Sequence, residues 1–320
     1  MDGSDIVSQP RIRRREIRAA DLDGIANLLT KGFPGRRRDH WVRALKRLSD
    51  HFTPPGFPKY GYLLECNGIP VGVSLHIYSS TPVNGEARIR CNLSSWYVEP
   101  GFRSYAPTLA SGGLKRKDVT FLNVTPALHT LPTLEAQGYA RYCQGWFAAV
   151  PTLSALCDDA HVELVGPDIC RSKDLQPFEE ELLLAHASYG CIGVTCHSGN
   201  RTYPFVFMPR RKFGVLPFAY LVYCRDVADF VRFARPVGRF LIKAGFPVVV
   251  LDSDGPIPGL VGKYLDTRPK YFKGPHRPRL GDLAYSELAM FPVRGERIWS
   301  GWRQVSSNAG VINKRWGHSK

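Results

Sequence analysis

The sequence predicts an α/β (α+β) protein with two lobes, each a mixed central sheet flanked by helices. Three observations support this prediction. The chain has 320 residues, which is long for one compact domain and natural for two. The order hairpin, strand, helix, buried strand, short helix occurs twice along the chain. Each repeat of this order includes one short, largely apolar strand, at 119–124 (VTFLNV) in the first and at 247–251 (PVVVL) in the second.

The first half begins with two amphipathic helices and then changes to strands. Apolar residues recur at helical spacing, with Ile25, Leu28 and Leu29 sharing one face of the first helix. Asn67-Gly68 is a strong signal for the turn of a β-hairpin. The predicted helices are 22–31, 39–50, 108–115 and 131–137, and the predicted strands are 14–18, 60–66, 69–78, 87–98 and 119–124.

The second half is interpreted by the same criteria. We expect helices at 175–186, 226–243 and 261–266, and strands at 191–196, 203–208, 218–224, 247–251 and 283–291. The predicted organisation is a first domain at 1–150, a second at 151–295, and a basic C-terminal tail at 296–320.

The net charge is +15 and lies mostly at the two ends of the chain. Residues 1–50 carry +5 and residues 263–320 carry +8. Basic runs of this kind could meet nucleic acid or another anionic partner. The run 35–47 (GRRRDHWVRALKR) contains Trp41 and Leu45, which need a core, and no nucleic-acid-reading motif accompanies it. A solvated basic surface is therefore the preferred interpretation, and nucleic acid is not an expected partner.

The eight cysteines form no C-x-x-C pair and lie in apolar or strand-like surroundings, which predicts buried thiols in a reducing compartment. Cys191, Cys196 and His197 are near neighbours but fit no zinc spacing, so no metal is expected. No apolar stretch of about 20 residues occurs, and the first residues lack the apolar core of a signal peptide. These observations predict a cytoplasmic protein without a membrane span.

The element order of residues 11–150 resembles the GNAT superfamily of acyl-CoA N-acyltransferases. The resemblance lies in the segments IRAADLDGIANLLTKGF (17–33), YLLECNGIPVGVSLHI (62–77), VEPGFRSYA (98–106), VTFLNV (119–124) and LEAQGY (134–139). The family pattern includes V-x-P-x-x-R after a strand and a helix that ends in a Gly-aromatic pair. Its matches here are Val98, Pro100, Arg103, Gly138 and Tyr139. The second half resembles a diverged second copy, as in tandem members of the family.

The resemblance implies acyl-CoA (acetyl-CoA) as co-substrate, with its pyrophosphate at the loop that begins with Arg103. A helix N-terminus offers unpaired N–H groups and a partial positive charge, and glycines let the backbone approach the phosphate. The family's two glycine positions are here Ala106 and Thr108, so we expect weaker binding, with a structural loop without ligand as the alternative. The implied cofactor-binding residues are Tyr97, Val98, Arg103, Ser104, Tyr105, Ala106, Thr108 and Asn123.

The catalytic residues are harder to assign. Leu134 occupies the position of the tyrosine acid that many members of the family use, and Ala127 that of a frequent asparagine. The strand 90–98 has no carboxylate. Candidates are Ser95 on that strand and His129, which could act as a base near neutral pH. A surface loop histidine is the alternative for His129.

The sequence therefore predicts transfer of an acyl group to the amine of a small molecule or peptide. A non-catalytic acyl-CoA-binding or scaffold protein is the alternative, favoured by Leu134 and Ala127. The run VVVLDSDG (248–255) matches the start of some phosphatase and glycosyltransferase motifs, but only 65 residues follow Gly255. A turn at a strand end is the preferred interpretation of that run.

Overall fold

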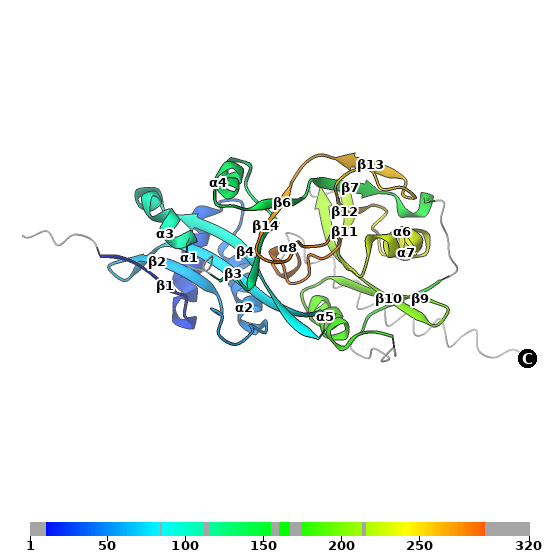
Figure 1. Ribbon diagram of the computed structural model, residues 1–320, viewed down its shortest axis with the longest axis horizontal. Coiled ribbons are helices and arrows are strands. Elements are labelled where there is room, and N and C mark those ends of the chain that lie inside the picture. Colours follow the sequence, from blue (N-terminus) through cyan, green and yellow to red (C-terminus); the bar gives the residue numbers. More distant parts are fainter. Residues whose placement is uncertain are drawn as a thin grey trace, which may run out of the picture.

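The structure is a computed structural model that describes residues 11–83, 85–111, 116–154, 160–166, 174–212 and 216–291. Residues 1–10 and the expected basic tail at 296–320 lie outside the described residues. Figure 1 shows two lobes side by side, the first in blue and cyan and the second in green and yellow. The predicted fold class of two mixed sheets flanked by helices is confirmed.

The first lobe is built on a seven-stranded mixed sheet. Its strands, in spatial order, are β1 (Ile12–Glu16), β2 (Gly61–Cys66), β3 (Ile69–Val83), β4 (Glu86–Val98), β5 (Val119–Asn123), β14 (Lys270–Lys273) and β6 (Ala140–Cys143). All neighbours are antiparallel except β4 and β5, which run parallel. The predicted turn between β2 and β3 is confirmed, because Asn67 and Gly68 both have positive φ, at 51° and 85°.

The second lobe repeats this order. Its strands are β8 (His161–Leu164), β9 (Ile192–Ser198), β10 (Arg201–Lys212), β11 (Leu216–Cys224), β12 (Val249–Ser253), β7 (Gly145–Ala149) and β13 (Gly262–Leu265). The parallel pair is β11 and β12, at the place that β4 and β5 hold in the first sheet. The two sheets therefore have equivalent topology, although the repeat is not visible in the residue types.

Each sheet takes one strand from the other half of the chain. β7 follows β6 after the single residue Gln144, yet it pairs with β12 and β13 of the second sheet. β14 follows β13 but pairs with β5 and β6 of the first sheet. A boundary at residue 150 therefore does not separate the two sheets, because β7 and β14 each lie on the other side of it from the rest of their sheet. The domain limits expected from the sequence stay a prediction.

Helices cover both sheets. They are α1 (Leu22–Gly32), α2 (Arg38–Asp50), α3 (Ala106–Ala110), α4 (Leu131–Ala136), α5 (Pro177–Ser188), α6 (Val227–Arg232), α7 (Ala234–Lys243) and α8 (Glu287–Met290). The apolar stripe of α1 and Trp41 of α2 pack on Leu75 and Ile77 of β3. Leu109 of α3 and Leu134 of α4 pack on the opposite face. In the second lobe, α6 and α7 cover one face, and α5 packs between the two sheets.

Three predicted elements differ from the structure. Residues 262–265, expected as part of a helix, form strand β13. They are a strand because they pair with β7, and their sequence shows no alternation of apolar and polar residues. The segment 283–291, expected as a strand, is a turn followed by α8, and it packs across the first sheet without joining it. The predicted helix 226–243 is two helices that meet at Phe233, whose buried ring packs into the second lobe.

Candidate functional site

The first sheet opens between β4 and β5. Their parallel pairing runs from Ile89 with Val119 to Asn92 with Leu122, while β4 continues to Val98. Ser95 has a φ of 52° at a shift in the β3–β4 register, so Ser95 and Trp96 form a β-bulge outside the regular pairing. Strands that separate beside a bulge leave backbone groups outside the regular pairing, which makes this the candidate reaction centre.

A carboxylate from the far end of the chain lies at this opening. Glu287, the first residue of α8, accepts hydrogen bonds from the hydroxyls of Ser94 on β4 and Thr125 just after β5. Ser94 also lies 3.0 Å from the hydroxyl of Ser95. Glu287 therefore links the two separated strands, and it stands beside the predicted Ser95.

The setting of Glu287 changes its proton affinity. Burial raises the pKa of the Glu287 carboxyl above its ordinary value, and the hydrogen bonds from Ser94 and Thr125 oppose this only in part. A carboxylate with a raised pKa is a better proton acceptor than a solvated one. On the same face, the amide oxygen of Asn92 is buried and has no hydrogen-bond partner among the described residues.

The segment that carries Glu287 is held from both lobes. The ring of Tyr285 lies between His51, at a centroid distance of 5.1 Å, and His186 of α5, at 4.8 Å. The backbone N–H of Tyr285 donates to Nε2 of His186 at 3.1 Å. Arg47 of α2 donates to the carbonyl oxygen of Met290 at 2.9 Å. These contacts fix the position of α8 over the opening.

The predicted phosphate loop is helical. Residues Pro100–Tyr105 form a 3-10 helix that continues into α3, and the N–H of Ala106 donates to the carbonyl oxygen of Arg103. Ala106 has a φ of −55°, so this position does not use the freedom of a glycine. The side chains of Arg103, Ser104, Tyr105 and Thr108 are exposed. An anion here would be bound by side chains more than by free backbone N–H groups.

The other predicted binding residues lie around the opening of the sheet. Val98 is buried against Leu64 and Leu109. Tyr97 packs its ring against Phe33 at a centroid distance of 6.4 Å. Asn123 ends β5 and pairs with Tyr271 of β14. The role of these residues in binding a cofactor stays a prediction.

The two predicted catalytic residues are not brought together by any described contact. His129 is exposed on a 3-10 turn between β5 and α4. Leu134, at the position of the family's tyrosine acid, is buried in the core under the first sheet. The sequence does not predict Glu287 as a site residue, because nothing in it links Glu287 to Ser94, 193 residues away. The sequence offers only one weak indication of its role: Glu287 is one of four acidic residues in the basic stretch 263–320.

The D-x-D run has structural roles. Asp252 is buried and accepts a hydrogen bond from Nζ of Lys270 at 2.6 Å, and Asp254 accepts one from the backbone N–H of Gln144 at 2.8 Å. No group of three or more metal-ligating side chains occurs within the described residues. Among the described residues, no helix is long and apolar enough to cross a bilayer.

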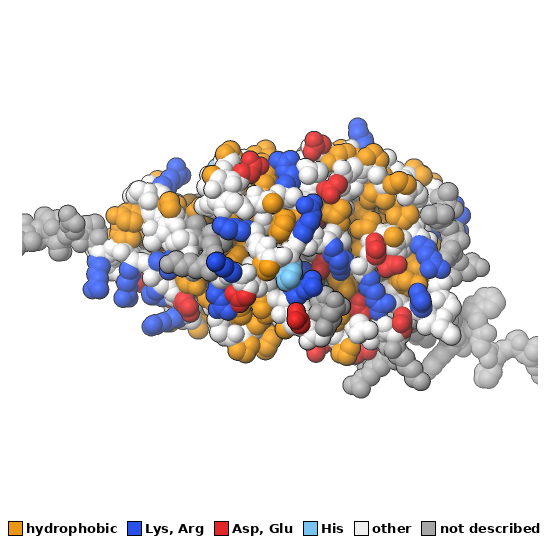
Figure 2. All heavy atoms as spheres, viewed as in Figure 1, with side chains coloured by type: hydrophobic (Ala, Val, Ile, Leu, Met, Phe, Trp, Pro, Cys, Tyr) orange, Lys and Arg blue, Asp and Glu red, His pale blue; other side chains and the backbone are white. Residues whose placement is uncertain are grey.

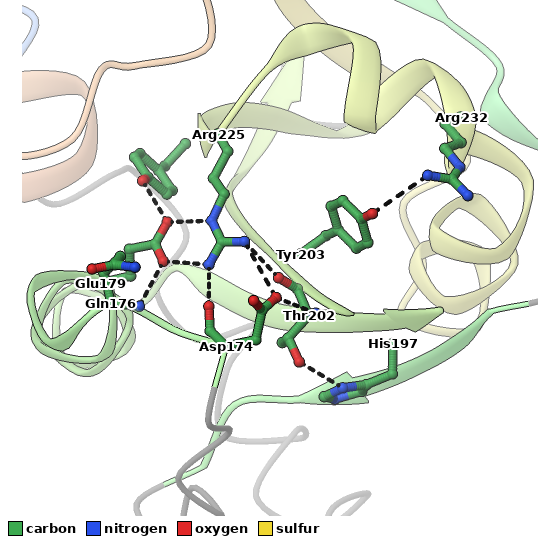
Figure 3. A network of polar contacts seen from close by, with 9 residues as sticks. Asp174, Gln176, Glu179, His197, Thr202, Tyr203, Arg225 and Arg232 are labelled. Carbon is green, nitrogen blue, oxygen red and sulfur yellow. Dashed lines mark hydrogen bonds and ion pairs between the residues drawn. The ribbon is translucent and has the colours of Figure 1, made fainter. Parts of the chain in front are cut away.

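At the equivalent turn of the second lobe, the arginine is held by internal contacts. Arg225, at the matching turn after β11, is engaged by Glu179, at 2.8 Å and 2.6 Å, and by the carbonyl oxygens of Thr202 and Asp174 (Figure 3). Asp226 caps α6 by accepting from the N–H of Ala228 at 2.9 Å. This turn is therefore occupied by internal contacts.

No protein-family profile matches this sequence, and no curated protein matches it. Solved structures do resemble it. A GCN5-related N-acetyltransferase from Anabaena variabilis has a TM-score of 0.55 at 10% identity, covering 82% of this chain and 72% of that one. A GCN5-related N-acetyltransferase from Kribbella flavida has a TM-score of 0.52 at 13% identity, with 82% and 71% covered. Eis1 from Mycobacterium abscessus has a TM-score of 0.50 at 13% identity, with 85% and 74% covered.

At identities this low, the likeness shows the fold and not the activity. The similarity extends over both lobes, since more than four fifths of the chain is covered in each of these matches. The order of elements in the first lobe, from the hairpin of β2 and β3 through β4, α3, β5 and α4, agrees with the resemblance found in the sequence. This chain therefore has the fold of the GCN5-related N-acetyltransferases.

Proposed function

We propose that this protein is an acyl-CoA-dependent N-acyltransferase whose reaction centre lies at the opening between β4 and β5. The observation that carries the proposal is the carboxylate of Glu287, hydrogen-bonded to Ser94 and Thr125 across that opening. It supplies the carboxylate that residues 90–98 of β4 lack.

In this proposal, acyl-CoA lies along β4 with its phosphates near Arg103. The guanidinium of Arg103 is exposed and has no ion-pair partner among the described residues, and the hydroxyls of Ser104 and Tyr105 are exposed beside it. The thioester would lie at the bulge, where the backbone groups of Ser95 and Trp96 are outside the regular pairing. Such N–H groups can stabilise the oxyanion that forms as the carbonyl is attacked.

Glu287 would take the proton of the acceptor ammonium group, directly or through Ser94. The free amine then attacks the thioester carbonyl and a C–N bond forms. The nitrogen releases its second proton to solvent, the C–S bond breaks, and the leaving thiolate takes up a proton from solvent. Leu134 has no ionisable group and cannot serve as the acid, so solvent fills that role. Acyl transfer of this kind depends mainly on positioning and oxyanion stabilisation.

The acceptor would be a small molecule or peptide with a primary amine. We further propose a cytoplasmic location, which the free thiols of six described cysteines support: Cys66, Cys91, Cys143, Cys191, Cys196 and Cys224. His129 is retained as a second candidate base, because its exposed turn follows β5.

The test is release of free thiol from acetyl-CoA in the presence of a panel of amino acids, polyamines and peptides. Glu287→Gln should lower the rate by about 10²- to 10⁴-fold, the usual contribution of a general base. Glu86→Gln is the matched control, because Glu86 is an exposed carboxylate at the start of β4, far along the strand from Ser94. It should retain the wild-type rate.

A different outcome would identify the alternative function. If the protein binds CoA by calorimetry but releases no thiol with any amine, it is an acyl-CoA-binding protein with an inactive acyltransferase fold. The buried Leu134 and the hydrogen-bonded backbone of the 100–105 helix favour that alternative.

A further inference from the structure

A cavity of about 530 Å³ lies between the two lobes. Its walls come from the start of β4, the end of β3, β5, the N-terminal turn of α5, the end of β11 and the segment 276–282. None of the predicted acyl-CoA residues lines it. Its volume is in the range of small-molecule sites.

The cavity is strongly basic. Five arginines line it against two acidic residues, Glu179 and Asp282. Figure 2 shows Lys and Arg side chains gathered at the middle of this face, between the lobes. The arginines of the cavity therefore lie where the lobes meet.

Three of these arginines are balanced by internal partners. Arg225 is held by the two carboxylate oxygens of Glu179 (Figure 3). Arg90 lies 3.0 Å from Asp282, and Arg279 lies 3.6 Å from the same carboxylate. Burial alone would raise the pKa of Asp282, but these two arginines outweigh it and lower that pKa. Asp282 is therefore an anion that neutralises part of the cluster.

The other two arginines have no acidic partner within the described part of the chain. Nε of Arg88 is buried and makes no hydrogen bond there. Arg277 has one long contact, from its guanidinium to the carbonyl oxygen of Tyr142 at 3.5 Å. An unpaired guanidinium that is partly removed from water is costly, and a bound anion would remove that cost at Arg88. Arg277 is exposed and adds its charge at the edge of the cavity. Arg88 and Arg277 thus offer uncompensated charge on two walls of one cavity.

Apolar side chains also line the cavity, beside the polar Thr81, Thr120, Gln176, Tyr223 and His276. Ile89 and Leu122 lie on the first sheet, and Phe178 and Leu182 lie on α5. A ligand that fits this lining has an apolar body as well as a charged group. The Arg225–Glu179 network keeps α5 in place as the apolar wall.

This cavity is separate from the candidate reaction centre. Arg90 and Val98 are eight residues apart on β4, about 26 Å at the rise of a strand. Ser94 is about 13 Å from Arg90 along the strand, and Asn92 and Ala284 are buried between them. A ligand in the cavity would therefore not contact Glu287.

We infer that this cavity is a second binding site, for an organic anion whose carboxylate or phosphate contacts Arg88 and Arg277 and whose apolar part packs on α5. The inference does not depend on acyltransferase activity. Planar, bidentate recognition of either oxyanion is a property of arginine.

The test is calorimetry on the full chain, without CoA, using three probes of similar shape: phenyl phosphate, 3-phenylpropionate and the neutral 3-phenylpropanamide. At least one anion should bind at one site per chain in the millimolar range or tighter, and the amide should not. The preferred anion then separates a phosphate ligand from a carboxylate ligand. Binding of neither anion, or equal binding of the amide, would overturn the inference.

Variants locate the site. Arg88→Ala and Arg277→Ala should each weaken the anion at least tenfold, while Arg239→Ala, an exposed arginine on α7, should leave it unchanged. Arg88→Lys keeps the charge if Arg88→Ala fails to fold. Unchanged affinity in Arg277→Ala and Arg88→Lys, or displacement of the anion by CoA, would show that the bound anion lies elsewhere.

Discussion

Nζ of Lys270 lies 2.6 Å from Oδ1 of Asp252, with only 1% and 2% of the two side chains exposed. Lys270 begins β14 in the first sheet, and Asp252 lies on β12 in the second. Lys270 also donates to the hydroxyl of Tyr220 at 3.2 Å. One buried ion pair thus joins the lobes at the place where they exchange strands.

Removing one partner of this pair should destabilise the protein strongly. Lys270→Met leaves the carboxylate of Asp252 buried without its counter-charge, which typically costs about 3–5 kcal/mol. Urea unfolding measures the change. Lys46→Met is the matched control, since the exposed pair of Lys46 with Asp50 should contribute less than about 1 kcal/mol. Equal, small losses in both variants would contradict a structural role for the buried pair.

The activity should rise with pH as Glu287 loses its proton. Because burial raises the pKa of Glu287, the acidic limb of the rate profile should lie above the ordinary glutamate value of 4.5. Glu287→Gln should remove this limb together with most of the rate. A limb that persists in the variant would assign it to another group, with His129 the first candidate.

The same pKa shift gives a test that needs no substrate. A carboxyl whose folded pKa is raised contributes stability that is fully present below its unfolded pKa and is lost as pH rises through the folded value. Glu287→Gln has no such loss, so its melting temperature relative to wild type should increase over that window. A constant difference at all pH values would show that the Glu287 carboxyl is not perturbed.

Arg103 should contribute to CoA affinity if the phosphates lie at the 100–105 helix. Arg103→Ala removes a charge-assisted contact of about 1.5–3 kcal/mol, which corresponds to roughly a ten- to hundredfold loss of affinity. Calorimetry with CoA measures it. Lys117→Ala is a suitable control, because Lys117 is an exposed cation of the same lobe. Equal affinities of wild type and Arg103→Ala would exclude this position.

Acid should destabilise the fold through His186. Burial lowers the pKa of His186 from 6.5 to about 4, so the folded state holds the ring neutral while the unfolded state takes up a proton. The free energy of unfolding should therefore fall by up to roughly 3 kcal/mol between pH 6.5 and pH 4. His40, His51 and His76 have lowered pKa values too, so wild type is compared with a variant.

His186→Gln is that variant, because its amide can donate to the carbonyl oxygen of Leu182 and accept from the N–H of Tyr285, as the ring does. Its stability should depend less steeply on pH over the same window. An unchanged slope, measured by urea unfolding at several pH values, would show that His186 titrates normally in the folded chain.

Part of the candidate site could be predicted from the sequence. The strand that ends at Val98 and the segment beginning at Pro100 were located, and Ser95 does lie at the bulge beside Glu287. The carboxylate could not be predicted, since α8 has only four residues and its position depends on contacts with Arg47 and His186.

The sequence by itself determined the local structure. Apolar stripes placed α1 and α2, Asn67-Gly68 placed the first hairpin, and two apolar runs placed β5 and β12. Each of these signals is contained within a few residues, because helix and strand periodicity act along the chain.

Tertiary structure alone decided the rest. β13 and β14 have four residues each and no alternation of their own, and each became a strand by filling a place between or beside strands from the other half of the chain. The contacts of Glu287 with Ser94 and of Lys270 with Asp252 likewise join residues that are distant in the sequence. The physical reason is that a four-residue strand or a single buried charge is stabilised by its distant partners, and these come together only when both lobes have folded.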